Sequence, residues 1–320
     1  MTMIGKLTKL FQKGPSSAPR LALAAFGKHP GWDDHIDDLG LDTTRLVRVK
    51  SVLYTQGISS NIDSADWDHL TEDQRLPRFA HEFVWRWAGE TVVGILWASQ
   101  DGKGRSKYPM ALCLQGTGVP VSWLCSVGLE RLRTLRDRCK GVTTAGSVRV
   151  AVEQARSELL EASRGVPEGD NEPERHLIRR LRSGSTAVSD DGFVRILYDI
   201  ERRLGPMREG AGKPRTRVID TSAHQFRLPK ATNGTVLESA RAWMAVVMDA
   251  IGAGPVLAAG VLAVDATEAG HVDLVVGEPT PASLFCLRAT PAREPMTSDI
   301  PFNMEEGFVS SARARMLAWG

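Results

Sequence analysis

The sequence predicts an α+β fold, in which an antiparallel sheet with helices packed on it is followed by a second α+β subdomain. Strand-like segments are grouped between about residues 82 and 114, and two helix-like segments follow them. The second half of the chain has a similar arrangement, with a helix and apolar strands of its own. Such grouping is typical of α+β layers, whereas parallel sheets alternate each strand with a helix.

The first 18 residues are predicted to form a flexible, weakly amphipathic arm. Its apolar residues have helical spacing with lysines between them, and Gly14 to Ser17 separates it from the first apolar run, Leu21 to Phe26. The arm lacks the continuous apolar core of a secretory signal. A cytoplasmic location is therefore expected.

A helix is predicted after the first apolar run. Asp42 is a suitable N-cap residue, and Gly57 is a suitable stop. Between them, one helix face carries Leu46, Val49 and Leu53.

Three strands are predicted next. Aromatic residues recur at every second position, which indicates a half-buried strand. These residues are Phe83, Trp85 and Trp87. Gly89 and Glu90 are expected to turn this strand into a hairpin with Thr91 to Ala98, and Pro109 to Leu114 is expected to form the third strand.

Two amphipathic helices are predicted to follow the strands, because two sets of residues recur with a helical period. The first set is Leu124, Gly128, Leu132, Leu135 and Cys139. The second set is Val148, Val152, Ala155 and Leu159.

A boundary between subdomains is predicted at residues 164–192, where Gly, Pro and Ser surround a short basic helix. It divides the chain into an arm (1–18), a first α+β domain (19–163), a linker (164–192) and a C-terminal α+β subdomain (193–320). The strands expected in the last part are Val256 to Val264, Val272 to Val276 and Ser283 to Leu287. Its helices are expected to carry Leu237, Met244, Val247 and Ile251, and then Phe308, Ala312 and Leu317. The shared style of the two halves is equally compatible with a distant duplication and with coincidence.

Residues 242–264 contain one charge, Asp249, and are nearly long enough to span a bilayer. Gly252 to Pro255 interrupts them and separates a segment of helical period from a shorter apolar run suited to a buried strand. No membrane span is predicted.

Composition limits the classes of partner. The 40 basic and 38 acidic residues nearly cancel, so no strong overall field favours nucleic acid or an anionic membrane. The four cysteines are widely spaced in mostly apolar surroundings and are predicted to be buried thiols. The seven histidines have no metal-ligand spacing, and most are expected at the surface or in turns.

Two polar motifs carry the strongest functional signal. The first is Phe26-Gly27-Lys28-His29-Pro30-Gly31-Trp32-Asp33-Asp34. The second is Ser99-Gln100-Asp101-Gly102-Lys103-Gly104-Arg105, followed by Tyr108-Pro109-Met110. The candidate motif or partner-binding residues are Gly27, Lys28, Pro30, Trp32, Asp34, Ser99, Asp101, Gly104, Arg105 and Pro109.

The two motifs, in this order, resemble the signature of the type VI secretion-associated TagF (ImpM) family. In that family Y/F-G-K-x-P-x-x-G-D precedes S-x-D-x-x-G-R-x-F-P-L, and the resemblance covers about the first half of this chain. The chain departs from the pattern at Asp33 and His35, and Ser106-Lys107 lengthens the spacing from arginine to proline. The resemblance is that of a divergent member.

The resemblance implies a longin- or profilin-like core for the first half and a non-enzymatic cytoplasmic role. It implies negative, post-translational regulation of type VI secretion through a protein partner. The family is linked to threonine phosphorylation control and to forkhead-associated-domain scaffolds, and some members are fused to a protein phosphatase. The implied partner is such a scaffold or a component of a kinase or phosphatase pathway. No catalytic, cofactor-binding or metal residues are expected.

The two motif loops are predicted to lie side by side. A guanidinium can bridge two carboxylates, so Arg105 is expected to join Asp101 and Asp34 in one charged network. For the second motif, a loop made rigid by its own hydrogen bonds is as good an interpretation as a binding role, because Asp101 can accept from backbone N–H groups and the loop glycines permit positive φ. The two interpretations are compatible. Ser99 is not favoured as a nucleophile, because no nucleophile elbow surrounds it.

Two other functions stay open. A longin-like adaptor that binds a small GTPase is one alternative. A metal-dependent hydrolase is another, because hard cations prefer several carboxylate oxygens. Its candidate ligands are Asp33, Asp34, His35, Asp37 and Asp38. We favour a helix cap or a solvated turn for this cluster, because its spacing lacks the glycine and the terminal glutamate of an EF-hand loop.

Arginine-rich helix faces are the second candidate for a contact with an acidic or phosphorylated partner, although such runs are more often a solvated flank. One face contains Arg131, Arg133, Arg136, Arg138 and Lys140, and the other contains Arg175, Arg179, Arg180 and Arg182. Among the eight tryptophans, Trp32 is the one expected to be partly exposed, where it would suit an interface.

Overall fold

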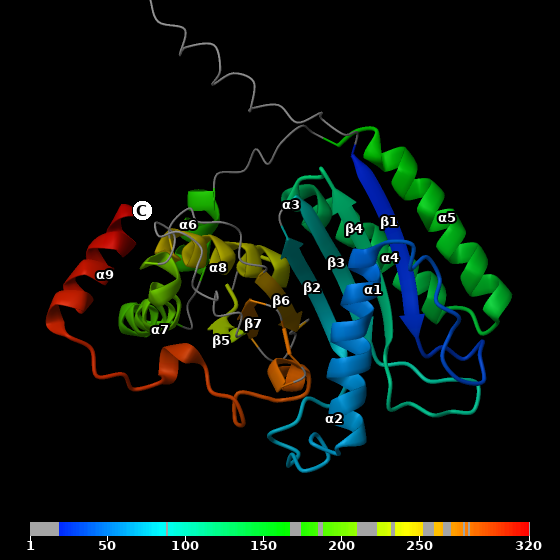
Figure 1. Cartoon of the computed structure of the whole chain (residues 1–320), viewed down its shortest axis with the longest axis horizontal. Coiled ribbons are helices and arrows are strands. Elements are labelled where there is room, and N and C mark those ends of the chain that lie inside the picture. Colours follow the sequence, from blue (N-terminus) through cyan, green and yellow to red (C-terminus); the bar gives the residue numbers. More distant parts are fainter. Residues whose placement is uncertain are drawn as a thin grey trace, which may run out of the picture.

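The computed structural model describes residues 19–87, 89–166, 174–184, 188–209, 223–231, 234–251, 259–264, 270–277, 279–280 and 282–319. The predicted arm, residues 1–18, lies outside the described residues. The predicted α+β class is confirmed: antiparallel strands form the middle layer, and helices cover both of its faces (Figure 1).

Four strands come from the first half of the chain. They are β1 (Arg20–Gly27), β2 (Ala80–Trp87), β3 (Glu90–Trp97) and β4 (Met110–Thr117). The meander β2-β3-β4 returns to β1, so these strands lie in the order β1-β4-β3-β2. The predicted hairpin is confirmed, with Gly89 in its turn at a φ of +75°.

One continuous helical segment crosses a face of the sheet in front of β3 and β4 (Figure 1). It consists of α1 (Thr44–Val49), the π-helical η2 (Lys50–Ser59) and α2 (Ser60–Asp63). The predicted apolar face is confirmed, because Leu46, Val49 and Leu53 are all buried.

Both predicted ends of this helix are wrong. The N-cap is Thr43, whose side chain accepts from the Leu46 N–H at 3.1 Å, and not Asp42. Gly57 does not end the helix. A Cβ there would lie 2.2 Å from the Leu284 side chain, so Gly57 permits close packing inside the helix.

The opposite face of this half is covered by α3 (Val121–Trp123), η3 (Leu124–Gly128), α4 (Leu129–Lys140) and α5 (Ala145–Ser163). Every residue of the two predicted stripes is buried. The stripes pack in the core beside the inward side chains of β3 and β4, including Ile95 and Leu112.

The second half contributes α6 (Glu174–Gly184), α7 (Asp190–Glu209), β5 (His224–Pro229), α8 (Val236–Ile251), β6 (Ala259–Val264), β7 (His271–Val276), the 3-10 helices η4 (Ala282–Leu287) and η5 (Thr297–Asp299), and α9 (Glu306–Ala318). The predicted helices around residues 237–251 and 308–317 and the strand at 272–276 are confirmed. The strand predicted at 256–264 is confirmed for residues 259–264, and residues 256–258 lie outside the described residues. In α9, Ala312 and Met316 are buried, whereas Leu317 is exposed.

The strand predicted at Ser283 to Leu287 is wrong, because this segment is the 3-10 helix η4. A short apolar run has no period that distinguishes a strand from a buried helical turn. Here Leu284 and Leu287 pack into the same core cluster as α1 and η2.

The seven strands found among the described residues form one antiparallel sheet in the order β1-β4-β3-β2-β6-β7-β5. The halves meet where β2 pairs with β6, from His81 opposite Val264 to Arg86 opposite Ala259. The prediction that β2 is half-buried is therefore wrong. Its two edges are paired, and core clusters cover both faces, with Val84 on one side and Phe83 on the other.

The predicted linker contains a packed helix. In α6, Leu177, Ile178 and Leu181 are buried and belong to the same core cluster as α8. The division of the chain at 164–192 stays a prediction.

The two halves share one feature of strand order, because in each of them the first strand pairs with the last, although the described residues of the first half form four strands and those of the second half form three. In each half a helical segment connects the first strand to the second, and the two segments lie on opposite faces of the sheet. In the first half this segment belongs to the core cluster on one face of the sheet, whereas α8 belongs to the cluster on the other face. This difference favours coincidence over duplication.

The apolar segment 242–264 is helix α8 up to Ile251 and strand β6 from Ala259, as predicted. Across the described part of the chain, every helix is too short or too polar to cross a bilayer.

Candidate functional site

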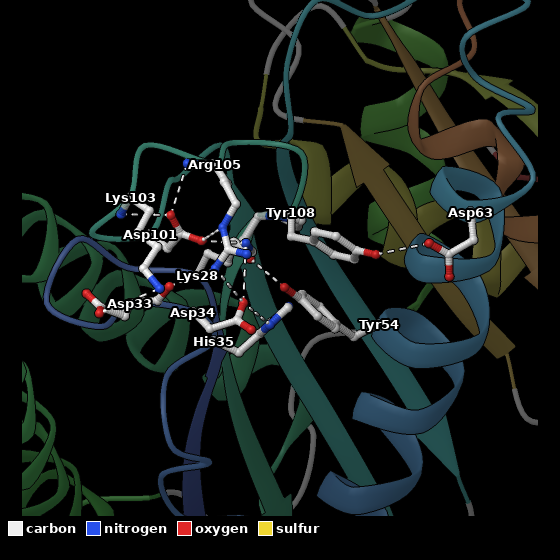
Figure 2. A network of polar contacts seen from close by, with 11 residues as sticks. Lys28, Asp33, Asp34, His35, Tyr54, Asp63, Asp101, Lys103, Arg105 and Tyr108 are labelled. Atoms are coloured by element: carbon white, nitrogen blue, oxygen red, sulfur yellow. Dashed lines mark hydrogen bonds and ion pairs between the residues drawn. The ribbon is translucent and has the colours of Figure 1, made fainter.

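The two sequence motifs meet at one end of the sheet, where β1 ends and β4 begins (Figure 2). Gly27 has a φ of +110°, and a Cβ on it would lie 2.3 Å from the Pro109 carbonyl oxygen. The next residue, Lys28, donates its backbone N–H to the same oxygen at 3.1 Å. The glycine of the first motif therefore lets the proline of the second approach its backbone.

A buried ion pair joins the motifs. The Lys28 Nζ lies 2.6 Å from the Asp101 Oδ2, and the two side chains are 4% and 0% exposed. A buried charge is costly unless it is paired and hydrogen-bonded. Each of these side chains therefore makes the burial of the other possible.

Asp101 also shapes its own loop. Its Oδ1 accepts from the backbone N–H groups of Lys103 at 3.0 Å and Arg105 at 2.9 Å. Gly104 has a φ of +76°, whereas Gly102 packs tightly, since a Cβ on it would lie 3.1 Å from the Pro30 oxygen. The self-bonded loop predicted for the second motif is confirmed, and Asp101 also joins this loop to the first one through Lys28. The binding role stays a prediction.

Arg105 extends the network to the surface, as predicted. Its Nε lies 2.7 Å from the Asp101 Oδ2, and its Nη2 lies 3.3 Å from the Asp34 Oδ1. The same Nη2 donates to the Asp33 carbonyl oxygen at 2.7 Å. The side chains of Arg105 and Asp34 are 52% and 65% exposed, so the outer end of the network faces solvent.

The positive charges of this network favour the ionised forms of Asp101 and Asp34. Desolvation would raise the pKa of Asp101, but hydrogen bonds from Lys28, Arg105 and Lys103 outweigh it and hold that pKa far below its usual range. The pKa of Asp34 is also lowered. Desolvation raises this pKa, but the opposing effects together are stronger, and the positive charge of Arg105 is the largest of them.

Aromatic side chains border the network, and sequence reasoning did not assign them to it. The Tyr54 hydroxyl donates to the Pro109 carbonyl oxygen at 3.1 Å, and burial raises the pKa of this tyrosine strongly. Tyr108 lies beside Tyr54, with Lys28 Nζ 5.6 Å from the centre of its ring, and His35 contacts both tyrosines edge-on. The sequence feature that could have indicated a role for Tyr54 was its position next to Leu53, a buried residue of the predicted helix.

The remaining candidate positions lie around this centre. Trp32 is partly exposed, as predicted, and its carbonyl oxygen accepts from the Gly102 N–H at 2.6 Å. Its indole lies against the Arg149 guanidinium, 5.7 Å from the ring centre. Pro30 and Ser99 are partly buried in the two loops.

The predicted acidic cluster is divided among separate cations. Asp33 faces Lys103, Asp34 faces Lys28 and Arg105, Asp37 contacts Arg149, and Asp38 contacts Lys50. No group of three or more His, Cys, Asp or Glu side chains in the described ranges is arranged to hold a metal ion. The pairing gives these carboxylates a role in fixing the loop.

Most histidines were expected at the surface or in turns, and three of the seven occupy buried positions. His29, His81 and His271 are buried. His29 supports the site, because its Nδ1 accepts from the Gly31 N–H at 3.0 Å and its Nε2 lies 2.9 Å from the Cys139 carbonyl oxygen. Of the four cysteines, Cys125 is partly exposed, and the others are buried thiols as predicted.

Ion pairs occupy much of the basic helix faces. On α4, Arg131 and Arg138 reach Glu158 of α5 at 3.8 and 3.0 Å. On α6, Arg180 pairs with Glu238 at 3.2 Å, and Arg182 donates to the Met316 carbonyl oxygen. The side chain of Arg175 lies outside the described residues.

Comparison of the chain with models of known protein families, with curated proteins and with solved structures finds no match.

Proposed function

We propose that the chain is a non-enzymatic regulator that acts by binding a protein partner through the exposed end of the motif network. One observation carries the proposal: the buried Lys28–Asp101 pair holds two loops together, so that Arg105 and Asp34 present a fixed pattern of charge to solvent. Ordered charges and a partly exposed tryptophan suit recognition, because little conformational freedom is lost when a partner binds.

The resemblance of the motifs suggests the setting. In the proposal, the chain is a cytoplasmic, TagF-like negative regulator of type VI secretion that acts after translation by sequestering its partner. The proposed partner is a forkhead-associated-domain scaffold or a component of a kinase or phosphatase pathway. Regulation by occlusion depends on the amounts of the two proteins and not on turnover.

The test is affinity capture of the tagged full-length chain from its native cells, followed by mass spectrometry. An Asp34→Ala/Arg105→Ala variant removes the exposed pair and leaves Lys28 and Asp101 in place. The matched control is Asp191→Ala/Arg313→Ala, because this pair joins α7 to α9 at 2.7 Å and is similarly exposed, at 67% and 57%.

We expect a secretion scaffold or phosphorylation-pathway component to be captured by the native chain and by the control, and to be lost with the Asp34/Arg105 variant. Equal capture by both variants would show that the network is only part of the fold. Nucleotide-dependent capture of a small GTPase would favour the adaptor alternative instead.

A further inference from the structure

A second charged feature lies beside α4, apart from the motif network. It is a recess of about 190 Å³ between the end of α4, the start of β2 and the end of β3. Three cationic residues line it, namely Arg78, Arg136 and Lys140. Ala80 and Ala98 contribute small side chains to its wall.

The cations of the recess are poorly neutralised. Arg136 and Lys140 lie one helical turn apart on α4, and among the described residues the exposed Asp137 is the one ion-pair partner of Arg136, at 2.9 Å. Within the ranges that the structure describes, no carboxylate lies at ion-pair distance from Arg78 or Lys140.

The carboxylate of Glu82, in the wall of the recess, is already paired with Arg133. Glu82 accepts from Arg133 through both oxygens, at 2.7 and 2.8 Å, and its side chain is 5% exposed. A bidentate pair of this kind satisfies both partners. The recess therefore has a net positive charge from Arg78, Arg136 and Lys140.

The surroundings of Lys140 disfavour its charged form. Burial lowers the pKa of its ammonium group, and the charges of Arg136 and Arg78 lower it further, against the opposing effect of Asp137. An anion in the recess would offset the charges of Arg136 and Arg78.

We propose that this recess binds the phosphoryl group of a small phosphorylated molecule. Guanidinium groups match phosphate oxygens with paired donors, and an ammonium group adds a compact charge. The volume is below the roughly 300–1,000 Å³ of pockets for drug-sized ligands, which favours a small molecule. The proposal is independent of the function proposed for the motif loops, because no residue of the Lys28–Asp101–Arg105–Asp34 network lines the recess.

Isothermal titration of the full-length chain tests the proposal, with orthophosphate and glycerol 3-phosphate as probes and glycerol as the uncharged control. We expect a phosphorylated probe to bind and glycerol not to bind. Arg78→Gln and Lys140→Gln should each weaken binding about tenfold, since each removes a charge-assisted contact.

The matched control is Arg131→Gln, which makes the same charge change on the same helix but outside the recess. It should leave the affinity unchanged, and circular dichroism verifies that each variant is folded. The proposal is overturned if neither probe binds, or if Arg131→Gln weakens binding as much as Lys140→Gln. Binding of a phosphoserine peptide without either small probe would also overturn it, in favour of a protein source for the phosphoryl group.

Discussion

Gly27 is the residue of the site at which a side chain would be tolerated least, because of its backbone conformation and its close neighbour. Replacing it with alanine puts a side chain in a left-handed conformation and against the Pro109 carbonyl oxygen. We expect Gly27→Ala to lower the free energy of unfolding by at least about 2 kcal/mol, from conformational strain and from overpacking.

Gly104 provides the matched control for Gly27. It also has a positive φ, but a Cβ on it would meet no atom within 4 Å. Gly104→Ala should therefore cost only the conformational term, about 1 kcal/mol. Urea denaturation measures both variants, and equal losses would contradict the role assigned to the Pro109 contact.

His81 should make the stability of the chain sensitive to acid. Burial lowers the pKa of this histidine to about 3, although Asp273 opposes the effect. An unfolded histidine has a pKa near 6.5, so below that pH the unfolded chain binds the proton more readily than the native chain. The contribution of His81 to stability therefore decreases as the pH falls from about 6.5 towards 3.

Urea denaturation of His81→Phe between pH 7 and pH 4 isolates this effect. The native chain should lose stability more steeply than the variant over this range. His69→Gln is the control, because His69 is exposed. Parallel curves for the native chain and His81→Phe would contradict the prediction.

At the scale of single residues, the sequence predicted that Arg105 joins Asp101 and Asp34, but it did not predict the buried Lys28–Asp101 pair or the surroundings of the network. The motifs named Asp34, Asp101 and Arg105, since oppositely charged side chains in two polar loops have an obvious way to pair. Tyr54 and His29 reach the site from a helix and from a buried turn. Their roles depend on tertiary packing, which local spacing does not encode.

A buried charge pair joins β5 to β7. Arg227 on β5 donates to both oxygens of Asp273 on β7, at 2.8 and 2.9 Å, and both side chains are buried. We expect Asp273→Ala to lower the free energy of unfolding by about 3–5 kcal/mol, because it leaves Arg227 buried without this partner.

The double variant Arg227→Met/Asp273→Leu removes both charges and should cost less than Asp273→Ala alone. Thermal and urea denaturation would both show this order. A double variant at least as destabilised as the single one would mean that shape, and not the uncompensated charge, determines the loss.

At the scale of elements, amphipathic periodicity was the reliable guide. It predicted α4, α5, α8 and the β2–β3 hairpin. It did not reveal β5, whose inward Arg227 makes the strand look polar in sequence. It also mistook η4 for a strand, since six residues are too few to show a period.

At the scale of the whole molecule, all the strands that the structure describes belong to one sheet, although the sequence suggested two subdomains. Hydrogen bonds between β2 and β6 join the halves across this sheet, and one core cluster extends from α5 to α8. The sequence could not predict this pairing, because it depends on two strands that are far apart in the chain.

We expect the two halves to unfold as one cooperative unit. Trp243→Ala in α8 removes a fully buried side chain from the second half and should cost about 3–5 kcal/mol. In native-state hydrogen exchange, the most protected amides of β3 should lose as much protection as those of β7. Loss confined to the second half would instead support a boundary at 164–192.

The junction of β2 with β6 also has a consequence for synthesis. The ribosome completes β2 and must add roughly 180 more residues before β6 is finished, which takes roughly 10–35 s at ordinary rates of translation. During that interval the nascent chain has an open strand edge next to Trp85, and such edges attract other chains. The period of greatest aggregation risk for this protein therefore comes before its last strands have been made.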